Sequence, residues 1–447
     1  MNIIKTKPRR IFDCRNVKIE YTQEQGVALG MIELFLSSDA QHFLLVGNAG
    51  TGKTTIAENI ARYAKAGILA PTNAALKRLK DKLMSEDIPV HRFQTIHQSL
   101  YGAPGPTGKY TRKKNSMSKY KVYIVDEASM IEEKLLEDLL DNVEKRGVKI
   151  IFIGDDFQLE PIGKDPVLFK WEKQRYLFKE EWKYKLNEVR RNEGVILTVA
   201  NKLRLSSHLP EILNYNTSEF KVVPKFTSEL PLDISHDKDF VVLVSTNKRR
   251  MQYNNLIRKE KFQEDSIEPI VDSERLISVS NQVYMNGDMY TIRHPKIIEN
   301  FYQKVNVGSI KYPEIKQYRF CLIEHEIENT IGSFMTLLVP DLDKPSLHSS
   351  SLMSCKFIFN HRIMSKYELK FGNKKIWNNN INIATYGYAT SVHKSQGNEW
   401  DTVYIDCDWL SPHWNHARWL YTAITRAKKR VELKNSSYFN IIPKEDG

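Results

Sequence analysis

A glycine-rich segment near the N-terminus has the residues best suited to chemistry. It reads FLLVGNAGTGKTT from Phe43 to Thr55 and matches the phosphate-binding pattern G-x-x-x-x-G-K-[ST]. Glycines let the backbone turn tightly, so that successive N–H groups can surround phosphate oxygens at a helix N-terminus. We expect Lys53 to reach the β- and γ-phosphates of a nucleoside triphosphate, and the Thr54 hydroxyl to bind Mg²⁺. The predicted nucleotide-binding residues are Gly47, Asn48, Ala49, Gly50, Thr51, Gly52, Lys53, Thr54 and Thr55.

Two later apolar runs end in polar residues that could complete such a site. Val122 to Val125 precedes Asp126 and Glu127. The aspartate can bind Mg²⁺, and the glutamate can polarise the water that attacks the γ-phosphate. Val148 to Ile153 precedes GDDFQLEPI, in which Gln158 is suited to sensing a γ-phosphate. The alternative for each pattern is an ordinary polar strand-to-loop junction.

The spacing of apolar residues predicts the elements that would position these side chains. Phe43 to Val46 is a short run of buried-strand type, and Thr55 to Ala66 has helical spacing. A second set of strand-like runs, Phe240 to Val244 and Thr402 to Ile405, also ends in polar segments. Ligands of a parallel sheet lie at the carboxyl ends of its strands. The sequence therefore predicts an α/β fold with two parallel sheets of the kind that bind nucleotides.

Composition indicates a soluble protein with a polyanionic partner. The chain has 447 residues, 41% of them hydrophobic, which is enough for about two to four domains. Its net charge of +12 favours binding to a polyanion, and the alternative is a generally basic protein. The four cysteines are too scattered for a disulfide framework, which suggests a cytoplasmic setting. No apolar run approaches the roughly 18 residues of a membrane span.

The segments described so far belong to a longer ordered series. In chain order the series is VGNAGTGKTT, APTNAAL (70–76), TIH (95–97), VDEASM (125–130), GDDFQLEPI (154–162), LNEVRRN (186–192), STNKRRMQYNNLIR (245–258), ATSVHKSQGNEWDTV (389–403) and LYTAITRAKKRV (420–431). The series resembles the motifs of superfamily 1 DNA helicases, most closely the RecD and phage Dda branch. The resemblance implies two RecA-like P-loop NTPase domains with parallel sheets, which bind ATP and Mg²⁺ in the cleft between them.

The resemblance assigns further residues to the nucleotide. Arg191 and Arg426 are expected to contact the γ-phosphate, because a guanidinium can meet two phosphate oxygens at once. Gln25 is expected to pair with the adenine edge, and Gly397 and Glu399 to lie at the nucleotide, Glu399 beside the ribose. The catalytic residues predicted in this way are Lys53, Glu127, Gln158, Arg191 and Arg426.

Several of these assignments have competitors. Arg190 and Arg430 are the competing arginines, and each arginine could instead be an ordinary surface residue. Gln23 is a competing glutamine, and the segment from Thr22 to Gln25 is also a plain helix-start signal.

Small polar residues at predicted strand ends are candidates for nucleic-acid contacts. Their side chains can hydrogen-bond phosphate oxygens whatever the base sequence. Within the resemblance they lie in motifs that grip a single strand, although each one alone could be an ordinary polar residue. They are Thr72, Asn73, Thr95, His97, Thr246, Asn247, Ser391 and His393.

Two segments between the motifs differ from the rest of the chain in composition, one being basic and the other β-rich. Tyr101 to Lys121 contains six Lys or Arg and no acidic residue, which predicts an exposed basic loop or hairpin. The resemblance places a duplex-splitting pin here, with Tyr101, Tyr110 and Tyr120 as stacking candidates, and the alternative is a solvated linker. Residues 261–380 are rich in β-type runs, where relatives insert a small SH3-like barrel.

We therefore predict four units and one activity. The units are a first RecA-like domain (1–100 and 122–225), a basic pin-like insertion (101–121), a second RecA-like domain (226–260 and 381–447) and a β-rich insertion (261–380). The activity is an ATP-dependent helicase that translocates on single-stranded DNA, 5′ to 3′ by resemblance. The alternatives are a translocase that strips proteins without unwinding and a slow, nucleotide-switched scaffold. The expected partners are single-stranded and forked DNA, together with single-strand-binding or replisome proteins. We expect no membrane association, and we expect the protein to be a monomer.

Overall fold

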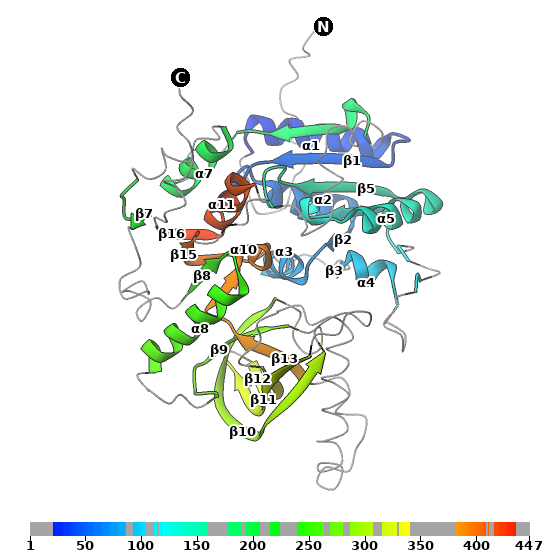
Figure 1. The fold of residues 1–447 in the computed structure, drawn as a ribbon. Helices are drawn as coiled ribbons and strands as arrows, with labels where there is room; N and C mark the ends of the chain where they lie inside the picture. The colour runs from blue at the N-terminus through cyan, green and yellow to red at the C-terminus, as the bar shows by residue number, and fades with distance from the viewer. Residues whose placement is uncertain are drawn as a thin grey trace.

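The described part of the chain forms two parallel sheets flanked by helices and one closed β-barrel (Figure 1). In this computed structural model the described residues are 21–85, 93–102, 111–113, 116–117, 119–159, 178–188, 194–205, 215–223, 239–262, 269–279, 287–306, 315–328, 330–339, 381–407, 410 and 415–434. The two parallel sheets and the small barrel confirm the predicted fold class.

The first sheet consists of parallel strands covered on both faces. Its order is β3 (Phe93–Thr95), β2 (Gly67–Ala70), β4 (Val122–Val125), β5 (Lys149–Gly154), β1 (His42–Gly47) and β6 (Lys183–Leu186). Along β1, Phe43 and Leu45 enter one buried cluster and Leu44 and Val46 enter another, which explains the continuous apolar run. The helices of this unit are α1 (Gln23–Ser37), α2 (Lys53–Ala64), α3 (Asn73–Ser85), α4 (Ile96–Leu100) and α5 (Glu133–Arg146), with the short 3-10 helices η1 (Ala128–Met130) and η2 (Glu180–Trp182).

The second sheet is also parallel. Its order is β14 (Ala389–Ser391), β8 (Phe240–Val244), β15 (Trp400–Asp406), β16 (Ala427–Lys434) and β7 (Phe220–Val223). In β8, Val241 and Leu243 pack into the cluster that contains Trp419, whereas Val242 faces the cluster that contains Tyr253. The helices of this unit are α7 (Val195–Leu205), α8 (Asn247–Phe262), α10 (Val392–Ser395) and α11 (His416–Ile424).

The barrel lies at the lower end of the molecule in Figure 1. It closes in the order β10 (Met289–Asn306), β11 (Ile315–Ile327), β12 (Thr330–Leu338), β13 (Ile381–Tyr386) and β9 (Arg275–Ser278). A buried ion pair of 2.9 Å between Arg258 of α8 and Glu274 ties the barrel to the second sheet. The backbone N–H of Arg275 also donates to the Tyr388 hydroxyl at 3.1 Å.

Two strands pair across the predicted domain limits. Strand β7 precedes residue 225, the predicted end of the first unit, but it pairs with β16 of the second sheet. Strand β13 starts at residue 381, the predicted return to the second motor unit, but it pairs with β9 and β12 in the barrel. Short apolar runs do not encode their partner strand, so pairing corrects the assignment of these two strands. Helix α7 also precedes residue 225, but it packs into the buried cluster of the second sheet, so its predicted assignment to the first unit is corrected too. The other limits remain predictions.

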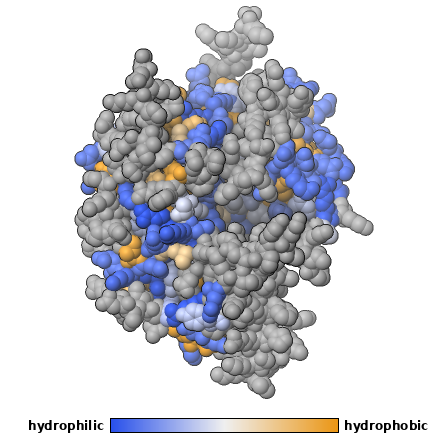
Figure 2. Space-filling model, in the orientation of Figure 1, coloured by the Kyte–Doolittle hydropathy of each residue, from blue (hydrophilic) through white to orange (hydrophobic). Residues whose placement is uncertain are grey.

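The described surface in Figure 2 is largely hydrophilic, with apolar residues in small separate groups. Large exposed apolar side chains in the described ranges are scattered over several elements: Val27, Leu34, Tyr63, Leu205, Ile297 and Tyr302. Among the described residues, no helix is long and apolar enough to cross a lipid bilayer.

Replacing Phe220 by alanine tests the assignment of β7 to the second sheet. Phe220 is fully buried in the cluster that contains Trp419, so Phe220→Ala should cost about 3 to 5 kcal/mol of unfolding free energy. Urea unfolding followed by tryptophan fluorescence measures this cost. Leu205→Ala, at an 87% exposed position, is the control and should cost about 0.5 kcal/mol or less. Equal midpoints for the two variants would contradict the assignment.

Candidate nucleotide site and nucleic-acid surface

The phosphate-binding segment folds as a tight loop between β1 and α2. Gly50 and Gly52 both have a φ of 80°, in the left-handed region that favours glycine. A Cβ at Gly52 would lie 2.2 Å from Nε2 of Gln25, so a larger residue there would have to displace this amide. The loop conformation therefore favours glycine at both positions, of which the motif specifies Gly52.

The Gln25 side chain braces this loop. Its Oε1 accepts a hydrogen bond from the Thr22 N–H at 3.1 Å, and its Nε2 donates to the Thr51 carbonyl at 2.9 Å. The first bond belongs to a capping box that starts α1, so the helix-start alternative describes this segment. Both ends of the amide have protein partners here, and the adenine contact stays a prediction.

Lys53 starts α2 and points back into the loop. Its ammonium donates to the carbonyl oxygens of Gly47 and Asn48 at 2.8 and 2.6 Å. Burial lowers the pKa of Lys53, and nearby carboxylates, Asp155 foremost, act against this effect. The cation is thus partly buried within the loop, and its contact with a phosphate stays a prediction.

Asp126 and Glu127 follow β4 and are almost fully buried. Burial and the charge of Glu127 raise the pKa of Asp126 to about 6. Burial also acts to raise the pKa of Glu127, but Arg78 and other cations outweigh it and the pKa is lowered. Glu127 has a φ of 51°, a conformation that a non-glycine residue adopts only when its surroundings hold it.

Buried polar atoms without a hydrogen-bond partner lie in the segments that follow β4 and β5. Asp126 Oδ2, Ser129 Oγ and Gln158 Oε1 are buried and have no hydrogen-bond partner among the described residues. Buried polar atoms normally bind a water, an ion or a ligand. Mg²⁺ keeps several waters and takes one or two protein oxygens beside substrate phosphates. This Asp126 oxygen has no hydrogen-bond partner within the described ranges and lies 3.9 Å from Arg78, and together with the Thr54 hydroxyl near the start of α2 it fits the predicted ion.

The segment after β5 joins the two sheets. Leu159 packs into the buried cluster of the second sheet, and its N–H donates to Oγ1 of Thr422 at 2.9 Å. Its carbonyl accepts from Nε2 of Gln396 at 2.9 Å. The neighbouring Gln158 carbonyl accepts a longer bond of 3.4 Å from Arg418. The predicted γ-phosphate sensor therefore lies at the junction of the two units.

Tyr421 of α11 links the phosphate loop to this junction. Its hydroxyl accepts from the Ala49 N–H at 2.8 Å and donates to Oδ2 of Asp155 at 2.6 Å. Arg204 of α7 binds the other oxygen of Asp155 at 3.0 Å. Burial raises the pKa of Tyr421, so the hydroxyl keeps the proton that it donates. The sequence analysis missed this residue, although it lies in the same motif as Arg426.

Arg426 is buried at the end of α11. Its Nε donates to the Thr422 carbonyl at 3.1 Å, and Nη1 donates to the Asn398 carbonyl at 3.4 Å. Burial lowers its pKa, and the charge of Glu127 opposes this effect. The competing Arg430 is paired with Glu432. Arg190 and Arg191 lie outside the described residues.

Arg78 of α3 is a site residue that the sequence analysis missed. Its Nη2 donates to Oε1 of Glu127 at 3.1 Å, and its Nη1 donates to Oε1 of Glu399 at 2.7 Å. Gly397, with a φ of 84°, lies so close to α3 that a Cβ would be 2.8 Å from the Ala75 nitrogen. A basic residue on a helix usually faces solvent, so the sequence carries no signal for this role.

The predicted nucleic-acid residues gather where strands lead into helices. Thr72, Thr95 and Thr246 accept hydrogen bonds from the N–H groups of Ala75, Gln98 and Arg249, and Ser391 is at the N-cap position of α10. Asn73 and Asn247 are the first residues of α3 and α8, and His97 is exposed on α4. His393 lies on α10, and burial lowers its pKa to about 4. These sites follow β2 and β3 at one edge of the first sheet and β8 and β14 at one edge of the second.

The described ends of the basic insertion are anchored to the first unit. The Tyr101 hydroxyl donates to Asp138 of α5, and Arg112 pairs with Asp138 and Asp141 of the same helix. Tyr120 is partly buried and meets Tyr123 edge-on, with ring centroids 5.8 Å apart. These two tyrosines contact the protein, and Tyr110 lies outside the described residues. Base stacking by all three stays a prediction.

Comparison with known proteins gives family matches at both ends of the motif series. The AAA domain family matches residues 20–216, and the UvrD-like helicase C-terminal domain matches residues 386–433. A mimivirus protein from Acanthamoeba polyphaga mimivirus, R530, is 23% identical over 92% of this chain and 98% of its own length. The RecD subunit of the RecBCD enzyme from Buchnera aphidicola (Schizaphis graminum) is 24% identical over 94% of this chain and 74% of its length.

A solved structure shares the fold. The Pif1 helicase from Bacteroides, solved with ADP-AlF3 and single-stranded DNA, has a TM-score of 0.52 and 18% sequence identity. The match covers 96% of this chain and 95% of that chain. It supports the arrangement of two parallel sheets with a small barrel.

Removing one hydroxyl tests the junction at the phosphate loop. Tyr421→Phe leaves the Ala49 N–H and one Asp155 oxygen without this partner in a buried site, which should cost about 1 to 3 kcal/mol. The midpoint of urea unfolding should fall accordingly. Tyr302→Phe, at a 62% exposed position, is the matched control and should not move the midpoint. A midpoint for Tyr421→Phe that equals the control would show that the hydroxyl does not hold the junction.

The partly buried His393 predicts a loss of stability in acid. Its pKa falls from 6.5 to about 4 on burial, so between these values the unfolded chain binds a proton that the folded chain does not. Stability should therefore be full above pH 6.5 and fall as the pH drops toward 4. Thermal unfolding at a series of pH values measures this effect. The unfolding temperature of His393→Asn should fall less steeply with decreasing pH than that of the parent protein. His97→Asn, at an exposed histidine, should follow the parent protein, and the same slope in both variants would exclude His393 as the cause.

Proposed function

Because the chain is a superfamily 1 ATP-dependent DNA helicase of the RecD and Pif1 type, we propose that it moves along single-stranded DNA and separates the duplex ahead of it. One observation supports this most. The phosphate loop of the first sheet meets α11 of the second sheet through the Tyr421 hydroxyl, so a nucleotide bound to the loop would lie at the contact between two movable units. The proposed 5′-to-3′ direction rests on family resemblance.

The residues divide the hydrolytic work among them. Lys53 and Arg426 bring positive charge to the β- and γ-phosphates of ATP, and Arg191 is proposed to do the same. Glu127 orients a water and accepts its proton as the water oxygen attacks the γ-phosphorus. Gln158 reports the γ-phosphate to the second unit. Mg²⁺, held by Thr54 and Asp126, would neutralise phosphate charge when bound.

The nucleic-acid surface is proposed to run along the strand-end caps of both sheets. Hydroxyl and amide groups at helix N-termini suit phosphate oxygens, because the helix dipole also favours an anion there. The eight predicted contact residues are proposed to hold single-stranded DNA at the two sheet edges. Forked DNA is the proposed substrate, and single-strand-binding or replisome proteins are the proposed partners of a cytoplasmic monomer. Residues 101–121 are proposed as the pin that meets the duplex.

Strand displacement tests the activity and its direction together. The protein should separate a DNA duplex with a 5′ single-stranded tail in the presence of ATP and Mg²⁺, and should leave the 3′-tailed duplex intact. Glu127→Gln should retain DNA binding and lose at least about 10² in ATP turnover, because the water loses its base. Stimulated ATPase without strand separation would instead indicate a translocase. Preference for an RNA tail or a 3′ tail would contradict the proposed substrate or direction.

A further inference from the structure

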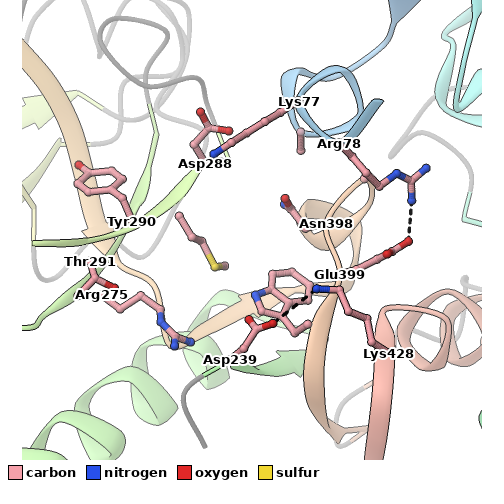
Figure 3. Close-up of a pocket in the computed structure, with 14 residues that line it drawn as sticks. Lys77, Arg78, Asp239, Arg275, Asp288, Tyr290, Thr291, Asn398, Glu399 and Lys428 are labelled. Carbon is pink, nitrogen blue, oxygen red and sulfur yellow. Dashed lines mark hydrogen bonds and ion pairs between the residues drawn. The ribbon is translucent and has the colours of Figure 1, made fainter. Parts of the chain in front are cut away.

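Arg78 spans the two units with one guanidinium. It holds Glu127 after β4 at 3.1 Å and Glu399 before β15 at 2.7 Å, and it lies 3.9 Å from Asp126. In Figure 3 Arg78 reaches down from α3 toward Glu399, whereas Lys77 of the same helix points toward Asp288. The side chain is 28% exposed and lines a cavity of about 440 Å³ between the two sheets and the barrel. The guanidinium therefore has open space beside it into which it could move.

The helix that carries Arg78 begins at a proposed nucleic-acid contact. Thr72 caps α3 through the Ala75 N–H, and Asn73 is its first residue. Arg78 follows five residues later, about 8 Å along the axis at about 1.5 Å per residue. A helix transmits a shift of its first turn to its second with little bending. If a strand bound at Thr72 and Asn73 shifted this end of α3, Arg78 would therefore move with it.

Close packing makes the link to the second unit equally direct. The Gly397 backbone lies against the N-terminal turn of α3, where a Cβ would be 2.8 Å from the Ala75 nitrogen and 3.2 Å from its Cα. The start of α3 and the segment that carries Glu399 are therefore in close contact. A change of α3 relative to this segment would therefore also act on the bond between Arg78 and Glu399.

The partner of Arg78 in the first unit is the proposed catalytic base. Glu127 must offer a carboxylate oxygen to the attacking water and take up its proton. A guanidinium bonded to Oε1 occupies one of the two carboxylate oxygens and holds the side chain in place, so this oxygen is not free to orient the water. A bond to Arg78 therefore works against hydrolysis.

We propose that Arg78 is a positioning residue that restrains Glu127, and that single-stranded DNA at the start of α3 releases this restraint. The inference rests on the proposed function, because it takes Glu127 as the base and Thr72 and Asn73 as DNA contacts. It gives the molecule a route by which DNA binding raises ATP turnover. The route consists of one helix and one side chain.

The rate of ATP hydrolysis without DNA tests the restraint. Arg78→Ala should raise the unstimulated kcat about tenfold, the effect of losing about 1.4 kcal/mol of restraint. The kcat with saturating oligo-dT should stay close to that of the parent, so the stimulation by DNA should shrink, and KM for ATP should change little. Arg78→Gln keeps much of the length without the charge and should give the same result, and it serves if Arg78→Ala does not fold.

The controls separate this inference from the proposed function. Lys77→Ala removes the neighbouring cation, which points toward Asp288 and away from Glu399 in Figure 3, and should leave both rates unchanged. If both Arg78 variants fold and lose the unstimulated and the stimulated rate alike, Arg78 supports Glu127 and the restraint is wrong. If Glu127→Gln still hydrolyses ATP at the parent rate, the base itself is misassigned and the proposed function fails. An inactive Glu127→Gln with no gain in the Arg78 variants overturns the restraint alone.

Discussion

The buried carboxylate of Asp155 is the constraint on which the junction of the two units depends. It is fully buried at the end of a strand of the first sheet, and its partners Arg204 and Tyr421 come from helices of the second unit. A buried carboxylate without partners costs several kcal/mol. If the units separated here, Asp155 would lose its bonds to Arg204 and Tyr421. The same tyrosine hydroxyl also accepts a hydrogen bond from the Ala49 N–H of the phosphate loop. The same polar network therefore holds the phosphate loop and joins the two units.

Around this network the cleft holds buried charges of both signs. Burial lowers the pKa of Lys53 and of Arg426, so each ammonium or guanidinium pays a desolvation cost that nearby carboxylates only partly offset. A polyphosphate would add negative charge beside these cations and would ease that cost. Arg78 adds a further cation and pairs with Glu127 of the first unit and Glu399 of the second. An anionic ligand beside these cations would therefore change the charge balance between the units.

The strand-end caps show why the nucleic-acid surface is hard to read from sequence. Thr72, Thr95 and Thr246 each satisfy a free N–H in the first turn of a helix. The residue types that cap a helix are those that can also bond a phosphate, since both tasks need a small hydroxyl or amide at a helix N-terminus. The sequence places these residues correctly after strands. It does not distinguish the two tasks, and the structure shows the capping bonds.

The sequence by itself determined the local pieces: the phosphate loop with its glycines, β4 and the acids after it, β8, and the presence of a β-rich insertion. Each depends on residues that are adjacent in the chain, where turn geometry and apolar period are directly encoded. Only the tertiary structure decided that β7 joins the second sheet and β13 the barrel, and that Arg78 and Tyr421 belong to the site. Arg78 and Glu399 are 321 residues apart. Such contacts depend on how whole units pack, and no local pattern records that.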